Sequence, residues 1–223
     1  MVPPVEMSAT VGNSSSNVIS EVLVCMHADE SDDRCALHRG VRARKNHTSR
    51  RDAFETVGAK PLGAVDYDTD PEACEVTFYR DHAERGETEL ALAPDLATDV
   101  ALLKFTPGAD AALVDAVEER AGVVIEGTGL GHVSTDWIPR IADLVDGGTT
   151  VVMTSQCIEG RVCDRVYDTG RDLLDAGVVE GEDTLPGTAK VKLMWALENS
   201  EDVREAMATS LAGERTERSV GRS

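Results

Sequence analysis

Long apolar runs, lysine and aromatic side chains are all scarce in this sequence. No window approaches the ~20 apolar residues that a membrane-spanning helix needs, so we expect no membrane span. The N-terminal stretch MVPPVEMSATVGNSSS has no basic region followed by an apolar run, which predicts no signal peptide and a cytoplasmic protein. The 223 residues, 41% of them hydrophobic, suffice for one domain, or for one domain and part of another.

The cysteines lack the spacing of a metal site or of a disulfide framework. There is no C-x-x-C motif, and no Cys/His pair has the spacing of zinc ligands. In a cytoplasmic chain an odd number of cysteines indicates free thiols. We therefore expect no metal, no disulfide and no cofactor. The five cysteines are residues 25, 35, 74, 157 and 163.

Acidic residues far outnumber basic ones, with 41 against 22 and a net charge of −19. An ordinary acidic cytosolic protein can carry such a charge. So can a protein adapted to a salt-rich cytosol, where screening weakens repulsion among surface acids. Only five lysines (45, 60, 104, 190 and 192) and three phenylalanines occur, which favours the halophilic alternative. The acidity also argues against direct nucleic-acid binding, because phosphate binding relies on a basic surface.

The stretch VVIEGTGLGHVSTDWIPRIADLVDGGTTVVMTSQC (123–157) has the pattern of strand, glycine-rich turn, helix and strand. A crossover unit of this size is typical of a parallel sheet with covered faces. Ligands of open α/β sheets bind where strands end and helices begin, which places a candidate site at 127–134. The spacing of G-T-G-L-G-H does not fit a nucleotide-binding fingerprint.

Apolar periodicity predicts an α/β protein with a linker in its first half. Residues 61–88 are rich in charges, Gly and Pro and predict a linker with little internal structure, between domains at 1–60 and 89–223. The predicted strands are 22–26, 89–93, 100–106, 123–127 and 150–155, and the predicted helices are 109–121, 134–146, 165–176, 187–198 and 200–210.

Residues 34–51 form the only basic island of the chain. It can be a solvated turn whose arginines pair with neighbouring acids. It can also be a nucleic-acid patch, although it contains no aromatic side chain on which bases would stack. A third alternative is a segment of an active site. The residues alone leave these alternatives open.

Five blocks of the sequence match the pattern of a known family. They are GTGLGHVS (127–134), VVMTSQCIEGRV (151–162), VYDTGRDL (166–173), VKLMWAL (191–197) and VCMHADESDDRCALHRGVRARKNHTSRRDAFETV (24–57). Together they resemble the asparaginase superfamily, and within it the D subunit of the archaeal amidotransferases that act on Glu-tRNA(Gln). The resemblance implies a C-terminal asparaginase-type domain, with a parallel sheet flanked by helices, preceded by a remnant of the N-terminal α/β domain.

The same resemblance implies two site residues. In asparaginases a lysine nine residues before a phenylalanine assists proton transfer, and Lys45 stands nine residues before Phe54. In the family's dimer the loop matching GTGLGHVS reaches the active site of the neighbouring protomer, where a polar side chain contacts substrate. His132 takes that position and can donate or accept a hydrogen bond, or it can simply orient the turn. Tyr167 is a weaker candidate.

The family's nucleophile is missing from these residues. Asparaginases attack the amide with a threonine of a Thr-Gly-Gly-Thr loop, assisted by a Gly-Thr-Asp-Thr segment, and neither motif occurs here. The Gly147–Thr150 run sits between a predicted helix and strand, and Ser134–Asp136 has the composition of a helix N-cap. We therefore expect a chain truncated at its N-terminus, inactive alone and with Lys45 largely exposed.

The function implied by the resemblance is that of a fragment of a glutaminase subunit. That glutaminase releases ammonia for conversion of Glu-tRNA(Gln) to Gln-tRNA(Gln). Its partner is the amidotransferase's E subunit, which holds the tRNA, and it forms a homodimer. The blocks around 153–157 and 192–195 favour this function over a free L-asparaginase. A non-catalytic interaction domain is the alternative from another class.

Overall fold

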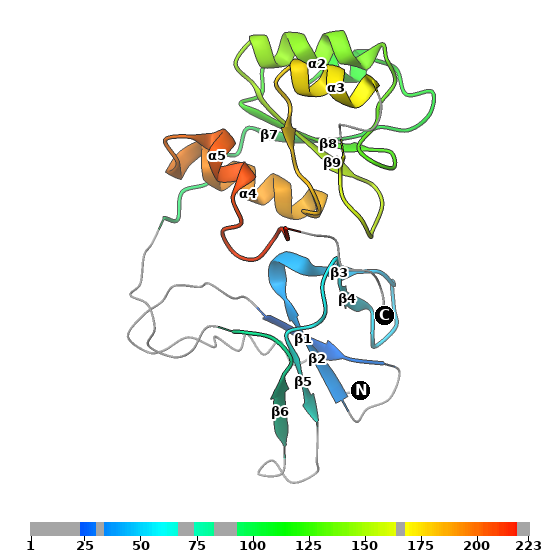
Figure 1. Cartoon of the computed structure of the whole chain (residues 1–223), viewed down its shortest axis with the longest axis vertical. Coiled ribbons are helices and arrows are strands. Elements are labelled where there is room, and N and C mark those ends of the chain that lie inside the picture. Colours follow the sequence, from blue (N-terminus) through cyan, green and yellow to red (C-terminus); the bar gives the residue numbers. More distant parts are fainter. Residues whose placement is uncertain (1–22, 30–33, 67–73, 83–92, 164–167, 218–223) are drawn as a thin grey trace. The chain divides into compact units, whose positions relative to one another are not determined.

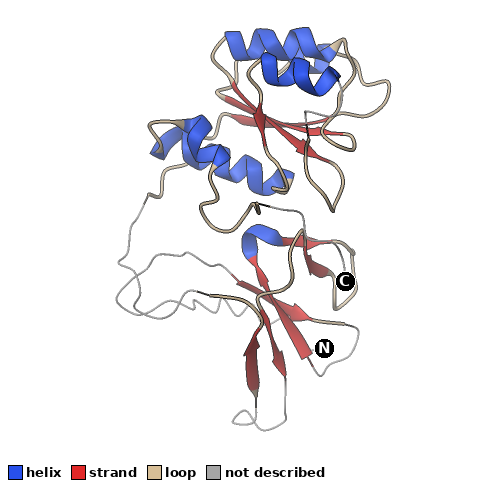
Figure 2. Ribbon diagram, in the orientation of Figure 1, coloured by secondary structure: helices blue, strands red, loops and turns tan. Residues whose placement is uncertain are grey.

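A computed structural model describes residues 23–29, 34–66, 74–82, 93–163 and 168–217. The chain divides into two compact units, Met1–Leu92 and Ala93–Ser223. The first is built mainly of strands, and the second alternates strands with helices (Figure 2). Among the helices of the described residues, none has the length and apolar character needed to cross a membrane.

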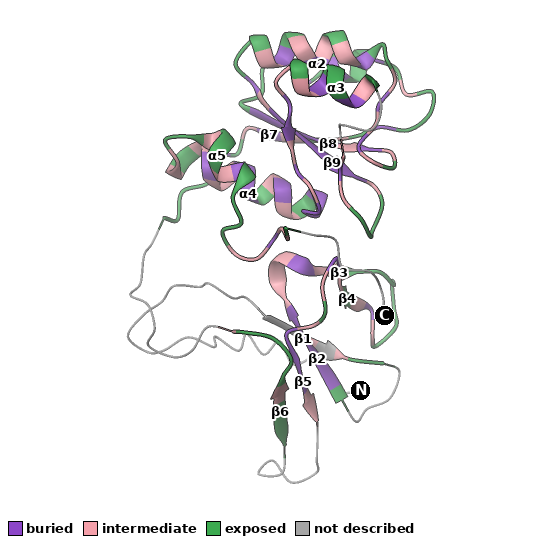
Figure 3. Ribbon diagram, viewed as in Figure 1, coloured by how far each residue is buried: buried purple, intermediate pink, exposed green. Residues whose placement is uncertain are grey.

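The second unit contains a four-stranded parallel sheet in the order β10-β9-β8-β7. The central strands are buried along nearly their whole length (Figure 3), and Val123, Val124 and Ile125 have no exposed surface. Continuous β-branched runs are typical of parallel strands covered on both faces. The predicted parallel sheet is therefore confirmed. The strands are β7 (Val100–Lys104), β8 (Gly122–Gly127), β9 (Thr150–Ser155) and β10 (Val179–Glu180).

Helices cover both faces of this sheet (Figure 1). Alternate residues of β8 point to opposite faces: Val123 and Ile125 pack in one cluster with α2 and α3, and Val124 packs in a second cluster with α4 and α5. Burial of Trp137 anchors α2, and its ring meets Phe105 edge-on at 5.2 Å. The helices are α2 (Trp137–Asp146), α3 (Asp168–Asp175), α4 (Pro186–Asn199) and α5 (Val203–Ala208).

Two predictions for the second unit need correction, and one predicted strand lies mostly outside the described residues. The helix expected at 109–121 is only α1 (Ala112–Asp115), because the backbone there closes successive i+3 turns rather than i+4 turns. Asp136 occupies the N-cap position of α2 without capping it, since its carboxylate instead accepts a hydrogen bond from the Ser134 hydroxyl. Most of the strand expected at 89–93 lies outside the described residues.

The first unit contains an antiparallel sheet in the order β1-β2-β5-β6. Buried Leu37 and Leu62 form the small core beneath it, together with Cys25 and Val65. A hairpin of β3 and β4 follows the short helix η1. The elements are β1 (Leu23–His27), β2 (Arg34–Arg39), η1 (Gly40–Arg42), β3 (Ala43–Lys45), β4 (Phe54–Thr56), β5 (Gly63–Asp66) and β6 (Glu75–Phe78).

The predicted lack of structure in 61–88 is wrong, because β5 and β6 both lie within it. β5 pairs with β2 on one side and β6 on the other. Gly63 is required there, since a Cβ atom at that position would lie 2.4 Å from the carbonyl oxygen of Thr77. Of the residues that indicated a linker, Gly63 and Asp66 thus belong to the interior strand β5, and Glu75 belongs to β6 at the edge of the sheet, where charged residues are common.

Candidate functional site

The loop after β8 is a tight turn built on glycine. Thr128 and His132 exchange two backbone hydrogen bonds of 2.8 Å across it. Gly131 has a φ of +99°, in the region that glycine occupies without strain. A Cβ atom on Gly127 would lie 2.6 Å from the carbonyl carbon of Gly131. Gly127 and Gly131 thus allow the two sides of the turn to approach each other closely. The turn places His132 at the carboxyl end of the sheet.

Residues at the end of β9 and in the segment after it hydrogen-bond to this loop. The Ser155 hydroxyl donates to the carbonyl of Gly129 at 2.5 Å, and the Cys163 amide donates to the carbonyl of Leu130 at 3.0 Å. The Gln156 side-chain amide donates to the carbonyl of Glu126 at 2.9 Å. The hydroxyl of Ser155, the last residue of β9, therefore joins the loop to the end of that strand, and Gln156 joins the same strand end to Glu126 of β8.

His132 is half-buried and held by a side chain of α3. Its Nδ1 atom lies 3.1 Å from Thr169 Oγ1, in a hydrogen bond whose direction depends on the tautomer of the ring. Thr169 stands in the first turn of α3, so the helix sets the orientation of the imidazole.

Lys45 belongs to the first unit and ends strand β3. It lies directly opposite Phe54 of β4 in the antiparallel register, which explains the nine-residue spacing between them. Lys45 is exposed, as we expected. The turn beyond it is ordered by His47, whose Nδ1 accepts the backbone amides of Ser49 and Arg50 at 3.1 and 3.0 Å.

The basic island forms β2, η1 and β3 rather than a single turn. Its arginines do pair with acids: Arg34 meets Asp66 at 2.9 Å, and Arg50 meets Asp52 at 2.6 Å. The hydrogen bond from Arg50 holds the pKa of Asp52 below its usual value. These pairs agree with the ion-pairing alternative and give no support to a nucleic-acid patch.

Two family models match the chain and together cover most of it. "Asparaginase, N-terminal" matches residues 6–81, and "Glutaminase/Asparaginase C-terminal domain" matches residues 99–209. The chain belongs to the asparaginase family. Its expected superfamily and fold are thereby confirmed.

Curated relatives of this asparaginase-family chain are named as the D subunit of Glutamyl-tRNA(Gln) amidotransferase. The protein of that name from Halobacterium salinarum is 66% identical over 206 residues, covering 90% of this chain and 48% of its own length. That from Archaeoglobus fulgidus is 53% identical over 200 residues, covering 88% and 47%. The chain thus spans about half the length of the curated relatives it matches. The relatives from Halobacterium and Haloquadratum fit the halophilic composition.

A solved structure has the same fold at lower identity. The thermostable L-asparaginase from Thermococcus kodakarensis matches with a TM-score of 0.72 and 28% identity, over 81% of this chain and 55% of that one. Both the fold and the family models therefore point to the asparaginase family, and the higher identities point to the amidotransferase branch within it.

The structure places two of the three predicted site residues. His132 lies in the second unit and Lys45 in the first, whereas Tyr167 lies outside the described residues. Among the residues that the structure describes, no three His, Cys, Asp or Glu side chains gather as a metal site would require. Thr169 and Gln156 were not predicted as site residues. Both stand in blocks that carried the resemblance, but only the folded chain brings them to the loop.

Proposed function

We propose that this chain supplies the C-terminal part of the glutaminase of a tRNA-dependent amidotransferase, which releases ammonia for the conversion of Glu-tRNA(Gln) to Gln-tRNA(Gln). The observation that carries the proposal is the 66% identity over 206 residues to the D subunit from Halobacterium salinarum, against 28% to the L-asparaginase of known structure. A free L-asparaginase is the second candidate, because that solved enzyme shares the fold.

The proposed chemistry is hydrolysis of a side-chain amide through a covalent intermediate. A threonine hydroxyl from outside these 223 residues attacks the amide carbon and expels ammonia, and water then hydrolyses the ester. Lys45 is proposed to assist the proton transfer from that hydroxyl. Its exposure in a hairpin leaves the side-chain amino group accessible to a partner surface. His132 is proposed to hold the substrate in the site of a neighbouring protomer, because Thr169 orients its ring.

The proposed partners follow from the same function. A homodimer brings the loop of His132 to the active site of the second protomer, and the tRNA-binding E subunit of the amidotransferase receives the ammonia. The tRNA contacts that partner rather than this acidic chain, whose net charge is −19. Since the reaction consumes an aminoacyl-tRNA, the proposed compartment is the cytoplasm.

A hybrid protein tests this function. The matched 206 residues of the Halobacterium salinarum relative are replaced by those of this chain, and ammonia release is measured with glutamine and with asparagine. Each substrate is supplied with and without Glu-tRNA(Gln) and the tRNA-binding partner. We expect glutamine hydrolysis that tRNA stimulates.

The controls separate the alternatives. The 223-residue chain alone should release no ammonia above a heat-killed sample, because the Thr-Gly-Gly-Thr motif is absent from it. Faster hydrolysis of asparagine without tRNA would favour the L-asparaginase. A folded hybrid that hydrolyses neither amide would support the non-catalytic alternative and contradict the proposal.

A further inference from the structure

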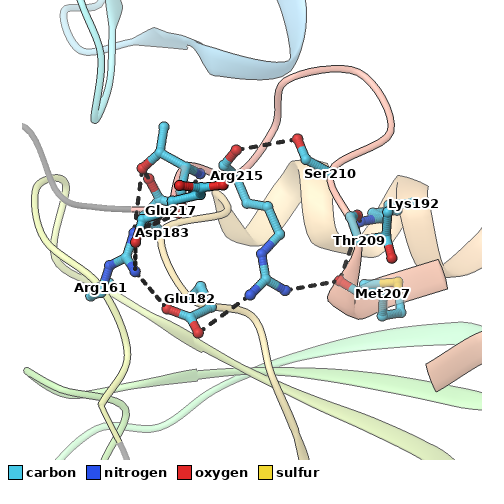
Figure 4. Close-up of polar contacts among 10 residues, drawn as sticks. Arg161, Glu182, Asp183, Lys192, Met207, Thr209, Ser210, Arg215 and Glu217 are labelled. Carbon is cyan, nitrogen blue, oxygen red and sulfur yellow. Dashed lines mark hydrogen bonds and ion pairs between the residues drawn. The ribbon is translucent and has the colours of Figure 1, made fainter. Parts of the chain in front are cut away.

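The C-terminal clasp, residues 210–217, is joined through Arg161 to the segment that follows β9 (Figure 4). Arg161 lies in that segment, and its guanidinium donates to the carbonyl of Thr216 at 2.7 Å and pairs with Glu182 at 3.0 Å. Asp183 accepts hydrogen bonds from the backbone amide and hydroxyl of Thr216, at 2.9 and 2.5 Å. Arg161 thus joins the loop after β9, the loop after β10 and the clasp.

Two further ion pairs fasten the clasp to the second unit. Arg215 pairs with Glu182 at 3.3 Å, and Glu214 pairs with Lys192 of α4 at 2.6 Å. Glu182 has a φ of +55°, the only positive φ of a non-glycine residue among those described. A left-handed glutamate costs free energy and persists where surrounding contacts determine its conformation. The two arginines on its carboxylate are such contacts.

The residues beside Arg161 in turn hold the loop of His132. The Val162 amide donates to the carbonyl of Glu182 at 3.0 Å, and the next residue donates to the carbonyl of Leu130. The side chain of Val162 also fills the space beside Gly131, where a Cβ atom would lie 2.9 Å from it. A shift of Arg161 would therefore be transmitted through its neighbour to the turn that carries His132.

We propose that Arg161 is a positioning residue for His132, and that the clasp sets its position. The guanidinium is planar and its donors form a fixed fork. The carbonyl of Thr216 and the carboxylate of Glu182 therefore fix its orientation, and the carboxylate also balances its charge. This inference rests on the proposed function of His132 in binding substrate. Arg161 itself touches no substrate and acts through the turn at 127–132.

The test measures the loop in the full chain without substrate. Arg161→Met removes the fork and keeps the aliphatic stem, and Arg161→Lys keeps the charge alone. Arg171→Met is the matched control, because Arg171 is exposed on α3 and pairs only at 3.8 Å with Asp168. Hydrogen exchange is followed at the amides of Gly131 and His132, and the ring nitrogens of His132 by NMR. The amide of Val124 in β8 reports the stability of the unit.

In Arg161→Met we expect the loop amides to exchange about tenfold faster or more, as loss of hydrogen bonds to a charged group implies. In the same variant the NMR signals of the His132 ring should shift, and hydrogen exchange at Val124 should change less than at the loop. Arg161→Lys should recover part of the effect. The control Arg171→Met should match the wild type. Arg215→Met offers the same readout from the clasp side if Arg161→Met does not fold.

Two results would overturn the proposal. One is unchanged loop exchange and unchanged ring signals in a folded variant. The other is an equal rise in exchange at Val124, which would make Arg161 a stabiliser of the whole unit. Neither result depends on amide hydrolysis. Failure of the hybrid enzyme would therefore remove the role of His132 in binding without altering how the turn is held.

Discussion

The pair of Lys192 and Glu214 is a buried ion pair, and removal of either partner should be costly. The two side chains are 7% and 3% exposed and their charged atoms lie 2.6 Å apart. Burial lowers the pKa of Lys192 against the raising effect of Glu214. For Glu214, burial raises the pKa, but the bonds from Lys192 and backbone amides outweigh it and hold the pKa below its usual value. The lowered pKa keeps the Glu214 carboxylate charged at neutral pH.

Removing one partner leaves the other charge buried without an opposite charge beside it. Lys192→Met and Glu214→Gln should each lower the free energy of unfolding by about 3–5 kcal/mol. Each remaining charge keeps some hydrogen bonds. The amides of Leu211 and Ala212 donate to the Glu214 carboxylate at 2.7–3.1 Å, and Lys192 donates to the carbonyls of Met207 and Thr209. The double variant carries neither charge of this pair, and its free energy of unfolding should fall no further than that of the more destabilised single variant.

Denaturant unfolding followed by tryptophan fluorescence measures these changes, because Trp137 and Trp195 both lie in the second unit. The matched control is the cycle of Arg120→Met and Asp99→Asn. That pair lies 2.6 Å apart but is about half exposed on each side, so solvent screening should leave its two changes nearly additive. If the two changes at Lys192 and Glu214 add within about 0.5 kcal/mol, the ion pair is not coupled and the reasoning is refuted.

Three further predictions concern other parts of the chain. Burial lowers the pKa of His38 from 6.5 to about 4. As the pH falls, the unfolded chain therefore binds a proton at this histidine before the folded chain does. The free energy of unfolding of the first unit should fall by about 3 kcal/mol between pH 6.5 and pH 4. Hydrogen exchange of β2 should show this loss in the wild type, and an equal loss in His38→Asn would contradict it. In the same denaturant assay, Gly131→Ala should lower the free energy of unfolding by about 2–3 kcal/mol, because φ is left-handed there and the new methyl group would contact Val162. Gly129→Ala, which has a left-handed φ but open space around it, should lower it by about 1 kcal/mol. Lys45→Met in the hybrid enzyme should lower kcat about 100-fold or more with little change in KM, and exposed Lys60→Met should leave both unchanged; equal effects of the two would refute a catalytic role.

The sequence predicted the second unit well where hydrophobic burial decides the structure. The runs at 123–127 and 150–155 became β8 and β9, because strands covered on both faces carry consecutive apolar residues, here Val123–Ile125 and Val151–Met153. The segment at 109–121 was harder. Its apolar residues have helical spacing, yet Val114 and Val117 are buried by successive tight turns rather than by one helix. Periodicity reports which side chains are buried, but it does not separate these two backbones.

The parts that could not be predicted depend on contacts between distant segments. β5 lies among glycines and charges, and its strand forms because β2 and β6 supply backbone partners on both sides. The same limit applies at the site. His132 was predicted by resemblance, whereas Thr169 lies 37 positions further along and Arg161 contacts a clasp 55 positions away. Local pattern carries no signal for such pairs.

The binding role of His132 in a glutaminase is tested most directly by the kinetics of glutamine hydrolysis in the hybrid enzyme. His132→Ala removes the ring that Thr169 orients, and Thr135→Ala changes an exposed neighbour as the control. Loss of one hydrogen bond to substrate should raise KM about tenfold while kcat changes little. A KM for His132→Ala equal to that of Thr135→Ala would contradict the proposal that this loop holds the substrate.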